Sequence, residues 1–156
     1  MNALPSPLSR RSALARLALV VAGAALPRAA FASGGPALAV YKSPTCGCCT
    51  AWVKHMRGAG FVVTTHDTDD VDAVKAQLGL RPQYASCHTG VVGRYLIEGH
   101  VSADLVLKLL REQPDALGLA VPGMPVGSPG MEGGTPDRYQ VLLLTRDGRS
   151  RVYAAR

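Results

Sequence analysis

The stretch ALAVYKSPTCGCCTAWVKHM, residues 37–56, brings together the features that decide the fold. Residues 37–41 are apolar and predict a short buried strand. Apolar side chains then recur at helical spacing, which predicts a helix over residues 48–58. Three of the chain's four cysteines lie where the two elements meet: Cys46, Cys48 and Cys49. We therefore expect these thiols in the loop after the first strand, at the start of the first helix.

The rest of the chain alternates strand and helix signals. They predict a strand at 61–65, a helix after Asp69 and Asp70 that ends at Gly79, a loop at 81–90, strands at 91–92 and 95–97, a helix that begins at Ser102, and hairpin strands at 141–144 and 151–153. Residues 113–137 are rich in Gly and Pro and predict a long loop. This order predicts an α/β fold: a single thioredoxin-like domain with a central sheet, a long Gly/Pro/Met loop and a C-terminal β-hairpin.

Composition and charge argue against a nucleic-acid-binding protein. The 156 residues are 47% hydrophobic and 18% charged, which is typical of a globular chain. The net charge of +6 comes largely from four arginines in residues 1–32, where no acidic residue occurs. The remainder holds 13 Lys and Arg against 11 Asp and Glu, and no basic cluster with interleaved aromatics follows. We therefore expect no nucleic-acid partner.

The N-terminus has the three-part pattern of an export signal. A positively charged start precedes an apolar run at 17–26, and Ala30-Phe31-Ala32 fits a cleavage site. The run is too short to span a bilayer, and Ser9–Leu14 resembles a twin-arginine signal. We expect a signal peptide over 1–32, a linker over 33–37 and the domain over 38–156, located in the periplasm without a stable membrane span. An uncleaved amphipathic anchor is the alternative.

The cysteine spacing leaves several kinds of chemistry open. Four cysteines in an exported protein first suggest two disulfides, but Cys48–Cys49 would be a vicinal bridge and Cys46–Cys48 would close a very small ring. Cys46 and Cys49 have the C-x-x-C spacing of a redox dithiol, which a helix N-terminus would activate. That interpretation leaves Cys48 without a role.

A soft-metal site would use every cysteine. Cys87-His88 could bring a fourth thiolate and an imidazole to the first motif, and thiolate-rich sites favour Cu(I), Zn(II) or iron–sulfur clusters. C-x-C-C with C-H is not the spaced-pair pattern of zinc, and three thiolates on one turn could bridge metal ions. These residues favour copper.

The methionines and the remaining histidines carry less weight. Met124 and Met131 lie in the long loop, where thioethers could bind Cu(I) or merely fill gaps. His100, at a strand–helix junction, could cap the helix or face the site, whereas His55 and His66 are expected on the surface.

The chain resembles the CopG-like periplasmic copper-resistance family. The similarity follows four motifs across residues 38–156: VYKSPTCGCCTAWVKHM, ASCHTGVVGRYLIEGHV, PGMPVGSPGME and YQVLLLTRDG. The resemblance implies a thioredoxin-like fold, a cysteine-bridged multinuclear Cu(I) cluster and a role in handling toxic copper, which could include changing its oxidation state. The metal-binding residues that it implies are Cys46, Cys48, Cys49, Cys87, His88, Met124 and Met131.

The sequence thus predicts a copper-binding protein of copper resistance and homeostasis. Its expected partners are copper ions and other periplasmic copper-handling proteins, and whether it turns over as an enzyme stays open. The alternative function is a thiol–disulfide oxidoreductase that uses the Cys46/Cys49 dithiol.

Overall fold

The predicted strands and helices occur in the predicted order, with one short strand added, in a computed structural model that describes residues 34–156. The export signal expected over 1–32 lies outside the described residues. The elements are β1 (Ala37–Lys42), α1 (Gly47–Gly58), β2 (Val62–Asp67), α2 (Val71–Gln77), a 3₁₀ helix (Pro82–Tyr84), β3 (His88–Val92), β4 (Tyr95–Glu98), α3 (Ala103–Glu112), β5 (Gly118–Ala120), β6 (Gln140–Leu144) and β7 (Ser150–Ala155). None of the helices in this part of the chain is long and apolar enough to cross a membrane.

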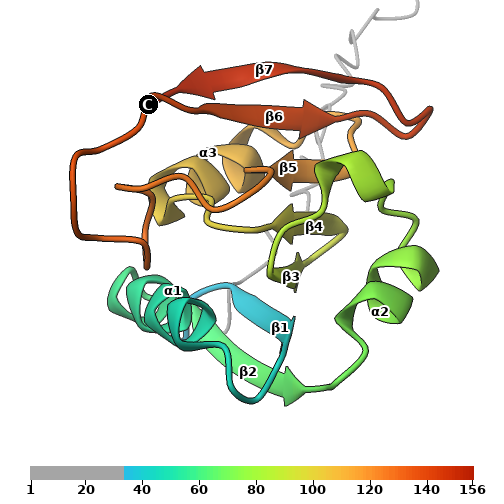
Figure 1. Ribbon diagram of the computed structural model, residues 1–156. Helices are drawn as coiled ribbons and strands as arrows, with labels where there is room; N and C mark the ends of the chain where they lie inside the picture. The colour runs from blue at the N-terminus through green and yellow to red at the C-terminus, as the bar shows by residue number, and fades with distance from the viewer. Residues whose placement is uncertain (1–33) are drawn as a thin grey trace, which may run out of the picture. The chain divides into compact units, whose positions relative to one another are not determined.

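All seven strands join one mixed sheet in the order β2-β1-β3-β4-β5-β6-β7 (Figure 1). The β1/β2 and β4/β5 pairs are parallel, and the other neighbours are antiparallel. The predicted C-terminal hairpin is present as β6 and β7, with Gly148 at a φ of 81° in its turn. That left-handed conformation favours glycine, as the Asp147-Gly148 signal indicated.

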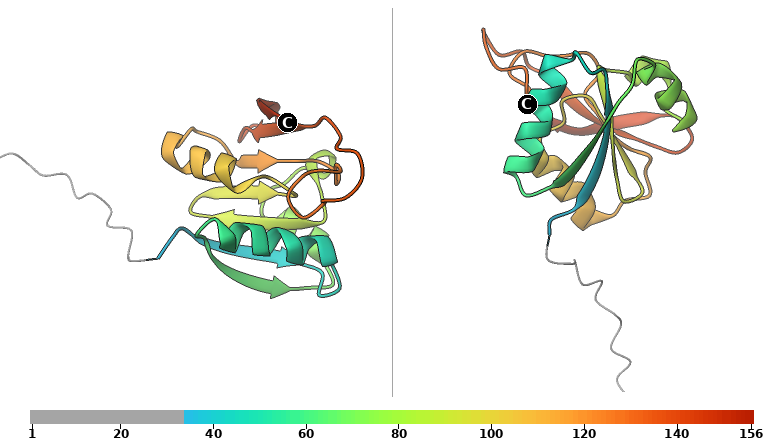
Figure 2. Two further views of the ribbon diagram at one scale, coloured as in Figure 1. Left: turned by 90° about the vertical axis from the view of Figure 1, so that its left-hand side faces the viewer. Right: turned by 90° about the horizontal axis from the view of Figure 1, so that it is seen from below.

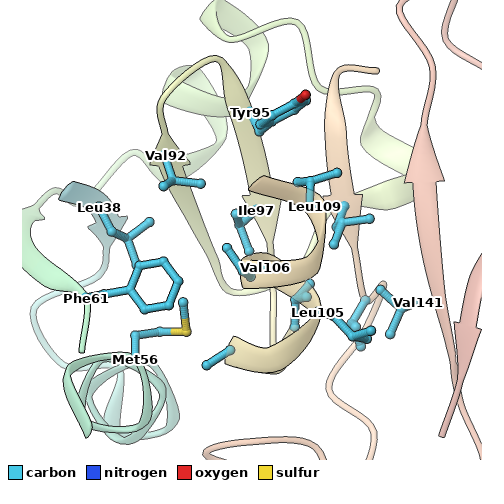
Figure 3. Packing of buried hydrophobic residues seen from close by; sticks show 14 of the residues in the cluster. Leu38, Met56, Phe61, Val92, Tyr95, Ile97, Leu105, Val106, Leu109 and Val141 are labelled. Carbon is cyan, nitrogen blue, oxygen red and sulfur yellow. The ribbon is translucent and has the colours of Figure 1, made fainter. Parts of the chain in front are cut away.

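The helices cover both faces of the sheet (Figures 1 and 2). α1 and α3 lie on one face, where their side chains and those of the strands form a core that includes Met56, Ile97 and Leu109 (Figure 3). α2 lies on the opposite face, beside a smaller cluster around Leu96 and Leu144. Adjacent strand residues therefore face different cores, as the two-residue period of a strand requires.

Side-chain caps explain where two of the helices begin. Asp70 caps α2 by accepting a hydrogen bond from the Ala73 amide at 2.9 Å, as expected from the sequence. Ser102 precedes α3 as predicted, but its side chain makes no capping bond. Instead Nε2 of His55, on α1, accepts from the Ala103 amide at 3.0 Å. His55 was expected on the solvated side of α1; its side chain is partly buried and ties α1 to α3 through this hydrogen bond.

Two predicted loops contain strand residues. The loop expected over 81–90 ends earlier, because His88–Gly90 belong to β3 and pair with β1. Because His88 and Thr89 are polar, nothing in the sequence indicated that this segment begins a buried strand. The long loop expected over 113–137 contains β5, which is only three residues long and extends the sheet beside β4. The single α/β domain is confirmed, while the finer thioredoxin-like assignment stays a prediction.

Candidate metal centre

Cys46 and Cys49 lie at the N-terminus of α1 and are joined by a disulfide. Cys46 is the residue that caps the helix, and its Sγ accepts from the Cys49 amide at 3.3 Å. The helix turn therefore holds the two sulfurs of the C-x-x-C pair together. The vicinal and small-ring pairings that the spacing disfavoured do not occur among the described cysteines, and Cys48 and Cys87 are free thiols.

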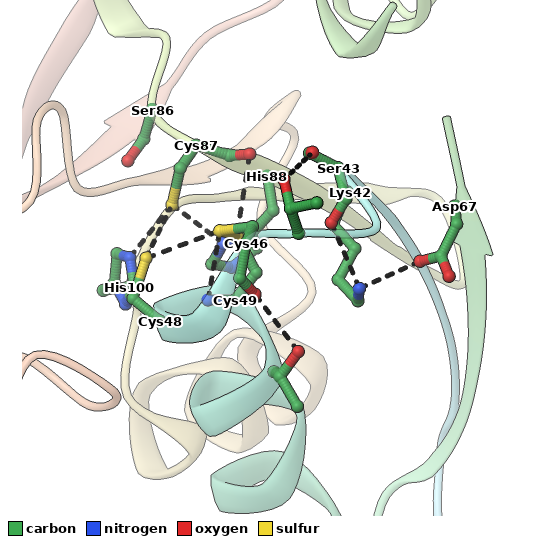
Figure 4. Close-up of a disulfide and its surroundings, with 12 residues drawn as sticks. Lys42, Ser43, Cys46, Cys48, Cys49, Asp67, Ser86, Cys87, His88 and His100 are labelled. Atoms are coloured by element: carbon green, nitrogen blue, oxygen red, sulfur yellow. Dashed lines mark hydrogen bonds and ion pairs between the residues drawn. A yellow bond between two sulfur atoms is a disulfide. The ribbon is translucent and has the colours of Figure 1, made fainter. Parts of the chain in front are cut away.

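Cys87 reaches this turn from the segment that precedes β3 (Figure 4). Its Sγ lies 3.8 Å from that of Cys48, which in turn lies 3.5 Å from that of Cys46. The Sγ atoms of all four cysteines are within 4.8 Å of one another. The structure thus brings together the four cysteines that the sequence proposed, across a separation of about 40 residues.

Two imidazoles approach the same Cys87 sulfur. Nδ1 of His88 lies 3.3 Å from it, and Nε2 of His100 lies 3.1 Å from it. One ring nitrogen of each histidine and the Cys87 sulfur form a second group of atoms within 4.8 Å of one another. Cys87 therefore belongs to both groups of potential ligands.

The sequence did not assign His100 as a metal ligand, although it placed this residue at a strand–helix junction where it could face the site. Its Nδ1 lies 2.8 Å from the Pro129 carbonyl oxygen, which can only accept, so Nδ1 carries the proton. In the neutral ring, Nε2 then directs a lone pair at Cys87. A histidine whose other nitrogen donates to a backbone carbonyl is oriented as metal-binding histidines are.

Burial keeps the imidazoles neutral and the thiol protonated. It lowers the pKa of His88 to about 3, with the nearby His100 and Lys75 adding to the shift. It also lowers the pKa of His100. Burial and the neighbouring Cys48 raise the pKa of the Cys87 thiol to about 12. A cation bound here would meet ready imidazole lone pairs but would have to displace the Cys87 proton.

One polar atom in the site has no protein partner. Nε2 of His88 is buried without a hydrogen bond, while the ring packs against Trp52 with centroids 4.4 Å apart. A buried polar atom without a partner is uncommon and costs stability. The His88 imidazole, the four sulfurs and the His100 nitrogen together make a donor set that fits a soft cation such as Cu(I).

The long loop covers the site at Pro129 and Gly130. His100 binds the Pro129 carbonyl, and Gly130 packs on the first turn of α1 with a φ of 88°. A Cβ added at Gly130 would lie 2.7 Å from the Cys48 carbonyl oxygen and 2.8 Å from the Trp52 amide nitrogen. This close approach requires glycine, so the loop is fitted to the cysteine turn.

The two methionines lie at different places in this loop. Met131 is partly buried and follows Gly130, whereas Met124 is 51% exposed. The residue before Met124, Gly123, accepts a hydrogen bond from Ser86 Oγ through its carbonyl oxygen. Both methionines are therefore in segments attached to the site.

A buried ion pair beside Cys87 was not predicted. Lys75 Nζ and Glu98 Oε1 are 2.8 Å apart, and both side chains are almost fully buried. Lys75 lies in a helix whose apolar face was expected at Val71, Val74 and Leu78. A lysine between apolar positions gives no sign that it will be buried, so only the tertiary structure shows this pair.

The described residues therefore form an α/β domain with a thiol-rich, histidine-flanked cluster at a helix N-terminus. Two solved structures, two forms of a copper resistance protein CopG, are 51% identical to the chain, each with a TM-score of 0.74. Each match covers 78% of this chain and 98% of the other. The family DUF411, described as proteins of unknown function, matches residues 84–131, and no curated protein gives a significant match. The chain belongs to the CopG-like copper resistance family.

Proposed function

We propose that the chain is a periplasmic copper-binding protein of copper resistance and homeostasis. In its reduced form it holds Cu(I) on Cys46, Cys48, Cys49 and Cys87, in a cysteine-bridged site with more than one copper. The observation that carries the proposal is the shared position of Cys87 in both ligand groups. Four sulfurs and two imidazoles exceed the four ligands of one tetrahedral ion, and a thiolate common to both groups is placed to bridge.

The protein's own residues prepare the site in three ways. The α1 N-terminus presents three sulfurs on one turn, where Cys46 Sγ accepts a hydrogen bond from the Cys49 amide. His88 and His100 offer neutral nitrogens, and the loop at Pro129–Gly130 packs against the turn and binds His100. Bound copper would supply the capacity for one-electron chemistry, which leaves room for a redox role.

The test is an anaerobic Cu(I) titration of reduced protein against a chelator of known affinity. We expect more than one copper per chain in the wild type and fewer in Cys48→Ser and in Cys87→Ser. Thr50→Ser is the matched control, because it alters the same turn without removing a sulfur. Uptake of one zinc and no copper would contradict the proposal.

The methionines are proposed as accessory ligands at the edge of the site. Met124→Leu and Met131→Leu preserve apolar bulk but remove the thioether. We expect weaker Cu(I) binding with unchanged stoichiometry. An unchanged affinity in both variants would assign the two side chains to packing alone.

A second candidate function has a specific observation behind it. The Cys46–Cys49 disulfide is the oxidised form of a C-x-x-C dithiol at a helix N-terminus, as in a thiol–disulfide oxidoreductase. This function predicts that metal-free protein reduces a disulfide substrate such as insulin. It also predicts that Cys48→Ser and Cys87→Ser keep that activity, whereas both variants lose copper under the first proposal.

A further inference from the structure

The buried pair Lys75 and Glu98 has no part in the ligand set, yet it lies directly against it. Lys75 is 4% exposed and Glu98 is fully buried. Removing two charges from water costs more than their attraction usually returns. We therefore looked for the contacts that this buried pair makes with the rest of the chain.

The Glu98 carboxylate accepts hydrogen bonds from the residues on both sides of Cys87-His88. Oε1 accepts from the Ser86 backbone N–H at 2.6 Å, and Oε2 accepts from Thr89 Oγ1 at 2.6 Å. Ser86 immediately precedes Cys87, and Thr89 immediately follows His88. One side chain thus fixes the two ends of a four-residue segment.

Lys75 completes this arrangement. Its Nζ donates to Glu98 Oε1 at 2.8 Å and to Thr89 Oγ1 at 2.9 Å. The carboxylate, ammonium and hydroxyl therefore form a closed network in which each group has partners. Because the network is buried, its bonds are not exchanged for water, and its geometry is well defined.

The chain that follows Glu98 reinforces the same segment. The Gly99 amide donates to the His88 carbonyl oxygen at 3.1 Å, and His100 then reaches the Cys87 sulfur. Residues 98–100 thus supply both the hydrogen bonds to Ser86, His88 and Thr89 and the second imidazole at Cys87.

We propose that Glu98, held by Lys75 and Thr89, is a positioning residue that keeps Cys87 within bonding range of the Cys48 turn. The inference rests on the proposed function, to which it adds the residues that set ligand geometry. Outer-shell partners of metal ligands typically contribute about 10- to 100-fold in metal affinity. The competing explanation is that the pair only stabilises the fold.

The decisive variant is Lys75→Met with Glu98→Leu. Replacing both charges by apolar side chains of similar size leaves no unpaired charge, so the fold should be retained. The Ser86 N–H and the Thr89 hydroxyl lose their acceptor, however. We expect Cu(I) affinity to fall about 10- to 100-fold. The matched control removes the exposed pair Arg146–Asp115, 3.1 Å apart, with Arg146→Gln and Asp115→Asn, and should bind as the wild type does.

A second readout needs no copper. With the Cys46–Cys49 disulfide intact, the only free thiols in the described residues are Cys48 and Cys87, with sulfurs 3.8 Å apart. A short bifunctional thiol crosslinker should join them rapidly in the wild type and severalfold more slowly in the double variant. Thr89→Val, which removes one hydroxyl and leaves the ion pair, should show smaller effects in the same direction. If the double variant does not fold, the Thr89→Val variant tests the positioning role instead.

The two readouts separate the possible results. Slower crosslinking together with weaker copper binding supports the positioning role. Crosslinking and affinity both at wild-type values in a folded variant would overturn it. A wild type that binds no copper but whose crosslinking still depends on Glu98 would refute the proposed function and leave the positioning role standing.

Discussion

Protonation of His88 should make the metal-free protein lose stability in mild acid. Burial lowers the pKa of this imidazole from 6.5 to about 3. Between these values the unfolded chain binds a proton that the folded chain does not. Stability therefore falls as the pH drops below the unfolded pKa, and the loss continues until the folded pKa is reached.

The size of the loss follows from the two pKa values. Going from about pH 7.5 to about pH 4.5, His88 should remove about 2.7 kcal/mol from the free energy of unfolding. Solvent does not weaken this effect, because the His88 side chain is fully buried. This loss is a large part of the stability of an ordinary domain.

The assay is urea unfolding over this pH range, with the disulfide intact, for the wild type and for His88→Phe. The raised pKa of buried Glu98 acts in the opposite direction, and the lowered pKa of His100 in the same direction, so the prediction concerns the difference between the two proteins. Phe keeps a ring beside Trp52 but cannot be protonated. The exposed His66 provides the control, since His66→Gln should follow the wild type. Equal pH dependence in His88→Phe and the wild type would refute the buried neutral imidazole.

Three further predictions test the network, the disulfide and the loop. Lys75→Met alone leaves the Glu98 charge buried without its partner and should destabilise the protein by about 3–5 kcal/mol in urea unfolding, whereas the Lys75→Met/Glu98→Leu pair should recover most of that loss. Thiol counting should find two more thiols per chain after the Cys46–Cys49 disulfide is reduced. Cu(I) uptake should be higher in the reduced protein than in the oxidised protein. Equal Cu(I) uptake by the two forms would exclude Cys46 and Cys49 as ligands. Gly130→Ala should cost about 1–3 kcal/mol, because the position has positive φ and no room for a Cβ, and an unchanged unfolding midpoint would show that the loop does not pack on α1.

Local signals were sufficient to predict most of the fold. The apolar run of β1, the Asp70 cap and the Asp147-Gly148 turn each act within a few residues, and all three appear in the structure as expected. The start of β3 was missed because His88 and Thr89 are polar, and nothing in the residues themselves shows that the fold buries both. The three-residue β5 was missed because so short a strand exists only through its neighbours.

The part of the site that depends only on residue type could be predicted from the sequence. Clustered cysteines and a C-H pair suggest a soft-metal site wherever the fold places them, and the structure does bring the four sulfurs together. The orientation of His100 depends on the Pro129 carbonyl, and the capping role of His55 depends on α3. Such contacts join elements whose mutual placement no local pattern encodes, so residue type alone could not assign them.

The two candidate functions need the same sulfurs in different states, so the state of the sulfurs can be used to decide between the functions. With Cys46 and Cys49 joined, only Cys48 and Cys87 remain as free thiols in the described chain, and these two do not amount to a multinuclear thiolate site. After a two-electron reduction, four sulfurs and two imidazoles become available together. A dithiol oxidoreductase would have no use for the neutral His88 and His100 gathered at Cys87, nor for a buried network that grips the segment on both sides of it. These features make sense when Cys87 must stay close to the α1 turn in the reduced protein, where no disulfide holds the sulfurs together. These features support the proposed copper site over the oxidoreductase, with the Cys46–Cys49 disulfide as the oxidised form of its dithiol.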